Sequence, residues 1–498
     1  KRIIEIYKEQ NINYNDTFYL AKGQIGKIYG FLGKTEKAIS LLLSLVKDSS
    51  KISKDILAKI YLYLGDVYEN KRQNDLSLKN YKNSFELSKE LNDNNLSAEL
   101  NRCLGIIMMN TGRFDEALNF YQKHMNYFVK QKNKLQIGTI SGNIGLIYFH
   151  QGKLDESFKF FEKQYEICKE LDSKQLLQHA LGNMALINNI KGEYKSAIAK
   201  FDDILAICED LNDVINISNT LGNIGIAYKN LGEYDLAIEQ YEKQLIIAEK
   251  SQFKRHICSA NTNIGVAYYN KGDFKKSFDF YDKAEKIVVK INDKNEESML
   301  YGNKGMLLFD MGKLDDALVE YKKSYEIFSS LNNIRGKALI NFEKSKILFY
   351  KNHLDESEKE ISKSCKVFEK IGDLPNYTKA LLQNSKVARN LNKLDDAKKY
   401  IKKSYDISKK LKLDKLIYSC MVEQEIINMY NDGNSKELVN LLQSSSSKFD
   451  SELIAYIHYN LWIHDKLESS KKIAFDLYKN LHKRIPKIIY KNYLDKLS

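Results

Sequence analysis

The stretch that decides the fold is residues 221–248, LGNIGIAYKNLGEYDLAIEQYEKQLIIA. Its first half places apolar or small side chains along one helical face, at Leu221, Ile224, Gly225 and Tyr228. Its second half, residues 236–248, carries another such face. Between the halves, in LGEYD, a glycine that can end a helix precedes acidic residues that favour the start of the next one. The stretch therefore predicts a hairpin of two α-helices.

The same pattern returns every 40 residues along most of the chain. One position of the period holds a glycine six times in succession and then asparagine, at Gly112, Gly152, Gly192, Gly232, Gly272, Gly312, Asn352 and Asn392. Small residues fill two further columns, those of Gly225 and Ala237. Larger side chains there would hold the helix axes apart, so these columns predict where the two helices approach closely. Since one hairpin cannot bury both of its apolar faces, neighbouring hairpins must stack.

The length of 498 residues first suggests about three compact domains. The chain has only two prolines and lacks the flexible linkers that such domains need, so a single array is the better prediction. We expect an N-terminal helix or cap over residues 1–16, the array over residues 17–410, and degenerate repeats with capping helices over residues 411–498. The end of the array is expected to degenerate because its outer face must be soluble.

The hairpins resemble the tetratricopeptide repeat (TPR) family. The family's first-helix pattern of Leu, Gly and Tyr is matched by Ile224, Gly225 and Tyr228, and its second-helix alanine and aromatic by Ala237 and Tyr241. The period exceeds the usual one of about 34 residues and the helix-ending proline is absent, which is similar to the longer-helix subclass of Pins-type adaptors, kinesin light chains and bacterial Rap-type regulators. The resemblance implies an all-α fold, a right-handed TPR superhelix (α-solenoid) of about ten to twelve hairpins.

A ladder of asparagines is the most informative polar feature. It occupies one first-helix column in five consecutive repeats, at Asn143, Asn183, Asn223, Asn263 and Asn303. In the TPR family this position faces the concave groove, and the resemblance implies the same role here. An amide both donates and accepts hydrogen bonds, so it can pair with the backbone of an extended peptide. Stacked helices place one amide about every 10 Å, and a strand rises about 3.3 Å per residue, so each amide would meet every third peptide residue.

Neighbours on the same helical face, three and seven positions further on, would give the groove its specificity. They are Leu146, His150, Leu186, Ile190, Ile226, Asn230, Val266, Asn270, Met306 and Asp310. This predicted groove is aliphatic with polar ends and carries little charge. The alternative interpretation is that the asparagines hold adjacent helices in register and bind no ligand.

No catalytic or metal-binding pattern is present in the sequence. The eight histidines include no pair four residues apart. Acidic pairs such as Asp115/Glu116 recur at the start of each second helix, where the helix dipole favours them. The six cysteines are widely spaced in apolar helical contexts, which predicts reduced core thiols. We therefore predict no enzyme, no cofactor and no metal site.

Since no apolar run reaches 18 residues, we also predict no membrane-spanning helix and a cytoplasmic protein.

These patterns predict a non-enzymatic protein–protein interaction module, a scaffold that binds a peptide or protein segment in its concave groove. The alternative is the sensor or regulatory arm of a larger signalling protein (a STAND-type ATPase, a kinase or a cyclase) that recognises a folded target. Because the sequence starts at Lys1 and not at Met, we expect a fragment, and in this alternative an effector domain would lie outside it. Nucleic-acid binding is disfavoured despite the net charge of +13, because one uniform column of asparagines does not suit the reading of varied bases.

Overall fold

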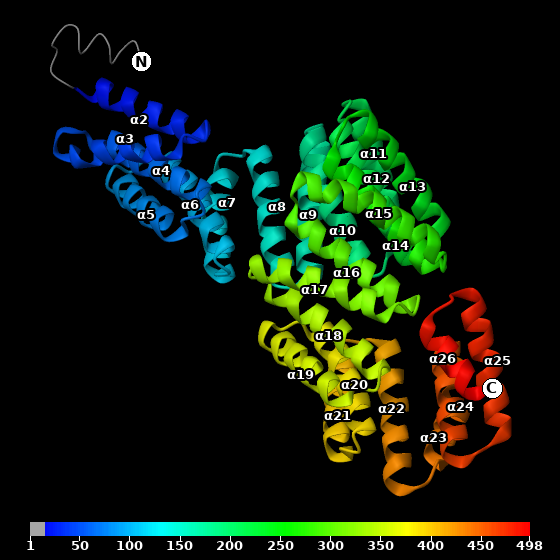
Figure 1. The fold of residues 1–498 in the computed structure, drawn as a ribbon. Coiled ribbons are helices and arrows are strands. Elements are labelled where there is room, and N and C mark those ends of the chain that lie inside the picture. Colours follow the sequence, from blue (N-terminus) through cyan, green and yellow to red (C-terminus); the bar gives the residue numbers. More distant parts are fainter. Residues whose placement is uncertain (1–14) are drawn as a thin grey trace. The chain divides into compact units, whose positions relative to one another are not determined.

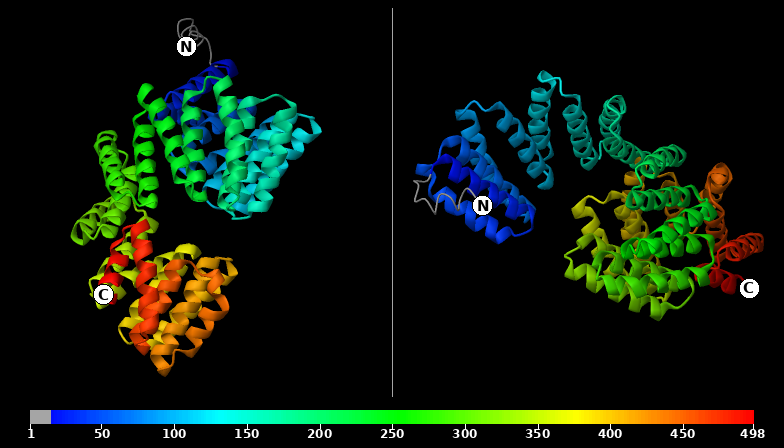
Figure 2. Two further views of the ribbon diagram at one scale, coloured as in Figure 1. Left: turned by 90° about the vertical axis from the view of Figure 1, so that its right-hand side faces the viewer. Right: turned by 90° about the horizontal axis from the view of Figure 1, so that it is seen from above.

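The fold is entirely α-helical over the described residues. A computed structural model describes residues 15–498, which form 25 α-helices, two short 3-10 helices and no strand (Figure 1). Successive helices pair into hairpins, and within each of two compact units each hairpin packs on the next, as two further views show (Figure 2). The predicted α-solenoid is therefore confirmed. The helix or cap expected over residues 1–16 lies almost wholly outside the described residues. No helix within the described part is both long and apolar enough to cross a membrane.

The chain divides into two compact units, Lys1–Leu211 and Asn212–Ser498, each of which is described by itself. The helices of the first unit are α2 (Asp16–Phe31), α3 (Thr35–Lys47), α4 (Lys54–Asn70), α5 (Asn74–Glu90), α6 (Asn94–Asn110), α7 (Phe114–Lys130), α8 (Lys134–His150), α9 (Leu154–Glu170), α10 (Lys174–Ile190) and α11 (Tyr194–Asp210), with the 3-10 helix η1 (Ser49–Lys51). Even-numbered helices are the first, and odd-numbered helices the second, of each hairpin.

The second unit continues the same alternation as far as α22. Its helices are α12 (Val214–Leu231), α13 (Tyr234–Lys250), α14 (Lys254–Lys271), α15 (Phe274–Ile291), α16 (Lys294–Asp310), α17 (Leu314–Ser330), α18 (Ile334–Tyr350), α19 (Leu354–Ile371), α20 (Leu374–Asn390), α21 (Leu394–Lys410), α22 (Asp414–Asp432), α23 (Lys436–Ser445), α24 (Ser451–Asp465), α25 (Glu468–Arg484) and α26 (Ile488–Leu497), with the 3-10 helix η2 (Ser446–Lys448). The shortened α23 marks the point at which the repeat pattern ends.

Turn residues in the left-handed region separate the helices at regular intervals. The predicted glycine column has positive φ from Gly112 to Gly312, and Asn352 and Asn392 continue it with φ of 60° and 61°. A second column, which the glycine pattern does not reveal, separates one hairpin from the next. It consists of Asn92, Lys132, Asp172, Asn212, Gln252, Asn292, Asn332, Gly372 and Lys412, all with positive φ. Because this column holds only one glycine, it was not apparent in the sequence.

The two columns of small residues lie where the helices of a hairpin touch, as predicted. The Ser77 hydroxyl donates to the Gly65 carbonyl oxygen at 2.9 Å, and the Ser157 hydroxyl donates to the Gly145 carbonyl oxygen at 2.8 Å. A side-chain hydroxyl can reach the backbone of the facing helix only when the two helices are close. An aromatic ring from the second helix fills the space beside the glycines of this column from Gly65 to Gly305, and these rings are buried at Tyr81, Tyr121, Phe161, Tyr241, Tyr281 and Tyr321.

Candidate functional site

The five ladder asparagines lie in the middle of the first helices. Asn143 and Asn183 are on α8 and α10 of the first unit, and the other three are on α12, α14 and α16 of the second. Asn223 is exposed and the others are half-buried. Among residues 15–498, none of the five amides has a hydrogen-bonding partner. All five therefore present an unpaired donor and acceptor.

In the second unit, the ladder helices lie on the inner side of the helical stack. First helices of successive repeats contact one another, from α12 with α14 to α20 with α22, more closely than the second helices do. When the helices on one side of a stack are spaced more closely than those on the other side, the stack curves and its closely spaced side becomes concave. The surface formed by α12, α14 and α16, which we call the first-helix surface, is therefore concave.

The predicted neighbours of the ladder differ in accessibility. Leu186 and Ile190 are exposed, at 43% and 52%, while Leu146, Ile226, Val266 and Met306 are half-buried. His150 is exposed and stacks on Phe114, with ring centroids 6.1 Å apart. Asn230 is exposed and Asn270 half-buried, and the Asn270 amide donates to the Val266 carbonyl oxygen at 2.9 Å. These side chains give the ladder an apolar border.

Asp310 departs from this pattern, because it is only 5% exposed. The Tyr269 hydroxyl donates to its carboxylate at 2.5 Å, and Lys487 Nζ lies 3.6 Å from the same oxygen. Lys487 precedes α26, so a segment from the end of the chain covers Asp310. The expectation that Asp310 is a polar contact on an open groove does not fit its burial.

The segment between α25 and α26 packs on the turns of two earlier repeats. A Cβ at Gly272 would lie 2.8 Å from the Arg484 carbonyl oxygen, and a Cβ at Gly312 would lie 3.1 Å from Ile488 Cδ1. Ile485 also joins the apolar cluster around Phe274. The turn glycines therefore end helices and also provide a docking place for the C-terminal segment. The sequence did not reveal this contact, because residues 485–488 lie beyond the period.

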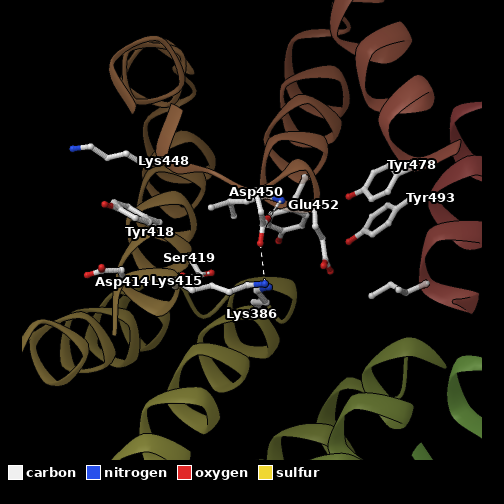
Figure 3. Close-up of a pocket in the computed structure, with 13 residues that line it drawn as sticks. Lys386, Asp414, Lys415, Tyr418, Ser419, Lys448, Asp450, Glu452, Tyr478 and Tyr493 are labelled. Atoms are coloured by element: carbon white, nitrogen blue, oxygen red, sulfur yellow. Dashed lines mark hydrogen bonds and ion pairs between the residues drawn. The ribbon is translucent and has the colours of Figure 1, made fainter. Parts of the chain in front are cut away.

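A pocket of about 420 Å³, which we call the C-terminal pocket, lies where α24, α25 and α26 meet α20 and α22 (Figure 3). Lys386 and Lys415 line one part of it, and Tyr478 and Tyr493 line another. Lys415 Nζ pairs with the Asp450 carboxylate at 2.8 Å. The Tyr478 and Tyr493 rings stack at 4.5 Å between centroids. These residues follow no periodic pattern in the sequence that would single them out.

A buried ion pair stands beside this pocket. Arg389 Nε donates to the Glu423 carboxylate at 2.8 Å, and the two side chains are 8% and 0% exposed. The Tyr456 hydroxyl donates to the other Glu423 oxygen at 3.2 Å and accepts from the Arg389 guanidinium at 3.0 Å. Burying two charges costs desolvation free energy, which must be offset by their mutual attraction and by further hydrogen bonds such as those of Tyr456. The pair therefore fixes α24 against α20 and α22.

The cysteine side chains lie inside the helical hairpins and stacks. All six cysteines are buried, as predicted, and burial raises the pKa of Cys103, Cys258 and Cys365 to about 12. A buried thiol with a raised pKa is a poor nucleophile. Within residues 15–498, no group of three His, Cys, Asp or Glu side chains is placed to hold a metal ion.

Comparison with known proteins places the repeats in a family. The tetratricopeptide repeat family model matches residues 96–170, 136–210, 176–250, 216–288 and 256–330. The solved structure of the apo form of RapI is similar at 16% identity and a TM-score of 0.53, over 72% of this chain and 99% of that one. The apo form of the quorum sensor NprR from B. thuringiensis is similar at 17% identity and a TM-score of 0.52, over 66% of this chain and 92% of that one.

At these identities the likeness to solved structures concerns the fold. Comparison with curated proteins gives no match. The family model covers the five repeats that carry the asparagine ladder. The repeats over residues 96–330 therefore belong to the tetratricopeptide repeat family.

Proposed function

We propose that this chain is a non-enzymatic binding module whose first-helix surface holds an extended segment of a peptide or protein partner. The observation that carries the proposal is the part of the ladder on this surface, the amides of Asn223, Asn263 and Asn303, which stand in one column without a hydrogen-bonding partner in the described residues. A packing role would give these amides partners on neighbouring helices. A ligand backbone would supply both the donors and the acceptors that they lack.

The surroundings of the ladder favour a peptide over a strongly charged ligand. Ile226, Val266 and Met306 follow these three amides on the same helices of the second unit, and Leu146 and Leu186 hold the equivalent positions on α8 and α10 of the first. Apolar borders with interspersed amides suit a segment that contributes both backbone and aliphatic side chains. The similarity of the fold to the quorum sensor NprR agrees with a binding role. We propose the cytoplasm as its compartment, since buried, unmodified thiols suit a reducing environment.

A peptide-display library selected on the whole chain tests this proposal. Selected peptides are measured by fluorescence anisotropy against the variant Asn223→Ala/Asn263→Ala. We expect affinity to fall roughly tenfold or more, because two hydrogen bonds worth about 1 kcal/mol each are lost. Helicity and melting temperature should stay unchanged.

The matched control is Asn119→Ala/Asn295→Ala, which removes two exposed asparagines outside the ladder column. It should bind like the unmodified chain. If the ladder variant binds as tightly as the control, the asparagines are structural and the proposed surface is misplaced.

A further inference from the structure

The C-terminal pocket contains hydrogen-bond donors that the protein itself does not use. Tyr478 is only 1% exposed, yet its hydroxyl has no partner in the described part of the chain and points into the pocket (Figure 3). The Tyr493 hydroxyl points into the pocket in the same way. Both hydroxyls face the open space of the pocket, where a ligand oxygen can accept a hydrogen bond from each of them.

Lys386 adds an unpaired positive charge. Its Nζ lies 4.8 Å from the ring centroid of Tyr456, and among residues 15–498 it forms no ion pair. The neighbouring Lys415 is already paired with Asp450. An ammonium group beside an aromatic ring, with no carboxylate partner, favours a negatively charged ligand.

Three carboxylates line the pocket; Asp414 is exposed and its side chain points away from Tyr478 and Tyr493 (Figure 3), and the other two are already engaged. Asp450 accepts from Lys415 Nζ and, at 2.9 Å, from the Leu453 backbone N–H at the start of α24. Glu452 accepts from the Tyr490 hydroxyl at 3.1 Å. Burial raises the pKa of Tyr478 and of Tyr493 above the ordinary range, so both hydroxyls keep their protons at neutral pH. The groups left for a ligand are therefore mainly donors.

We infer that the C-terminal pocket binds an organic carboxylate with an aromatic or aliphatic body. Lys386 and the hydroxyls of Tyr478 and Tyr493 receive the carboxylate. Leu453 and Ile489 line the same pocket and supply apolar contact for the body. The volume of about 420 Å³ falls within the range of roughly 300–1,000 Å³ that small-molecule sites occupy.

Two sources can supply this chemistry. One is a free small acid. The other is the carboxyl-terminal residue of a peptide, because Lys386 stands two periods after Met306 in the column that borders the ladder. The pocket thus lies further along the same row of first helices. The inference does not rest on the ladder, since its groups belong to α20, α24, α25 and α26.

The test uses the whole chain and a pair of probes of equal size. N-acetyl-phenylalanine carries the carboxylate, and N-acetyl-phenylalaninamide replaces it with a neutral amide. Saturation-transfer NMR and calorimetry should show that the acid binds and that the amide binds at least tenfold more weakly. Equal binding of both probes, or no binding of the acid at millimolar concentration, overturns the inference.

Matched variants locate the site. Lys386→Met should weaken binding of the acid at least tenfold, and Tyr478→Phe, which keeps the packed ring, about fivefold. The controls are Lys379→Met, an exposed lysine on the same helix, and Tyr281→Phe, a buried tyrosine of another repeat. Both should bind as the unmodified chain does. Circular dichroism confirms that each variant is folded, and unchanged binding by folded Lys386→Met and Tyr478→Phe contradicts the assignment.

One further measurement distinguishes a free acid from a peptide carboxyl terminus as the ligand. Another distinguishes binding in the C-terminal pocket from binding along the asparagine ladder. A tetrapeptide that ends in phenylalanine with a free carboxyl terminus binds more tightly than N-acetyl-phenylalanine if the pocket takes peptide ends, and more weakly if it takes free acids. The variant Asn223→Ala/Asn263→Ala should bind N-acetyl-phenylalanine normally. Loss of acid binding in that variant would contradict a separate site, whereas failure of the ladder in peptide binding leaves this pocket unaffected.

Discussion

The ring of Tyr241 on α13 lies directly against the backbone of Gly225 on α12. A Cβ at residue 225 would stand 2.4 Å from Tyr241 Cε1. The same relationship joins Gly65 to Tyr81, Gly265 to Tyr281 and Gly305 to Tyr321. The glycine and aromatic columns are thus two halves of one contact, which holds each hairpin together.

Gly225→Ala should destabilise the second unit by about 2 kcal/mol, because a buried ring cannot move away without disturbing its neighbours. Urea unfolding followed by circular dichroism measures the change. Gly302→Ala is the control, since its Cβ would meet nothing closer than 3.7 Å. That control should stabilise by about 0.5–1 kcal/mol through helix propensity. Destabilisation of both variants by equal amounts would show that the contact with Tyr241 is not the cause.

Gln252→Gly should stabilise the chain by about 0.5 kcal/mol. Gln252 has a φ of 56° in the turn between two hairpins. Glycine adopts this left-handed conformation without the strain of about 1–2 kcal/mol that a side chain causes. Part of this gain is lost because glycine also increases the conformational entropy of the unfolded chain.

Gly232→Ala is the reciprocal test of backbone strain. Its φ is 88°, and a Cβ there would meet no atom within 4 Å, so steric contact plays no part. We expect a loss of about 1 kcal/mol by thermal unfolding. A neutral result would mean that these turns tolerate alanine without strain.

Arg389→Met should destabilise the second unit by about 3–5 kcal/mol, because it leaves the fully buried Glu423 carboxylate without its cation. The double variant Arg389→Met/Glu423→Met should recover much of the loss, since neither charge remains. Removal of an exposed partner, in Lys322→Met, should change stability by less than about 0.5 kcal/mol. A double variant no better than the single one would contradict this account.

Asp66→Asn should stabilise the first unit at neutral pH. The pKa of Asp66 is raised to about 6, mainly by burial; a hydrogen bond from Tyr81 lowers it and the nearby Glu69 carboxylate raises it. The folded state therefore holds a proton that the unfolded state releases above about pH 4, so this group lowers stability as pH rises from about 4 to 6.

The gain from Asp66→Asn should be about 1–3 kcal/mol at pH 7 and should vanish near pH 4, as thermal unfolding across this range would show. Glu166→Gln, at an exposed position on α9, provides the comparison for a surface carboxylate. A gain that is the same at both pH values would mean that Asp66 does not titrate as its burial indicates.

The sequence predicted the repeating hairpin because the information is local. Helix faces follow from spacings of three and four residues, and the glycines at 112 to 312 end helices through their own backbone preference. The turn at Gln252 escaped prediction because a non-glycine residue can be forced to positive φ by the helices on both sides.

The sequence by itself thus determined the helices, their pairing and the column in which the asparagines stand. Only the tertiary structure decided that Asp310 is covered by Lys487, and that Lys386 meets tyrosines of α25 and α26 in one pocket. The physical reason is that the residues in these contacts are far apart along the chain. Each repeat specifies its contacts with its immediate neighbours, whereas contacts between distant repeats depend on the curvature that accumulates over the whole stack.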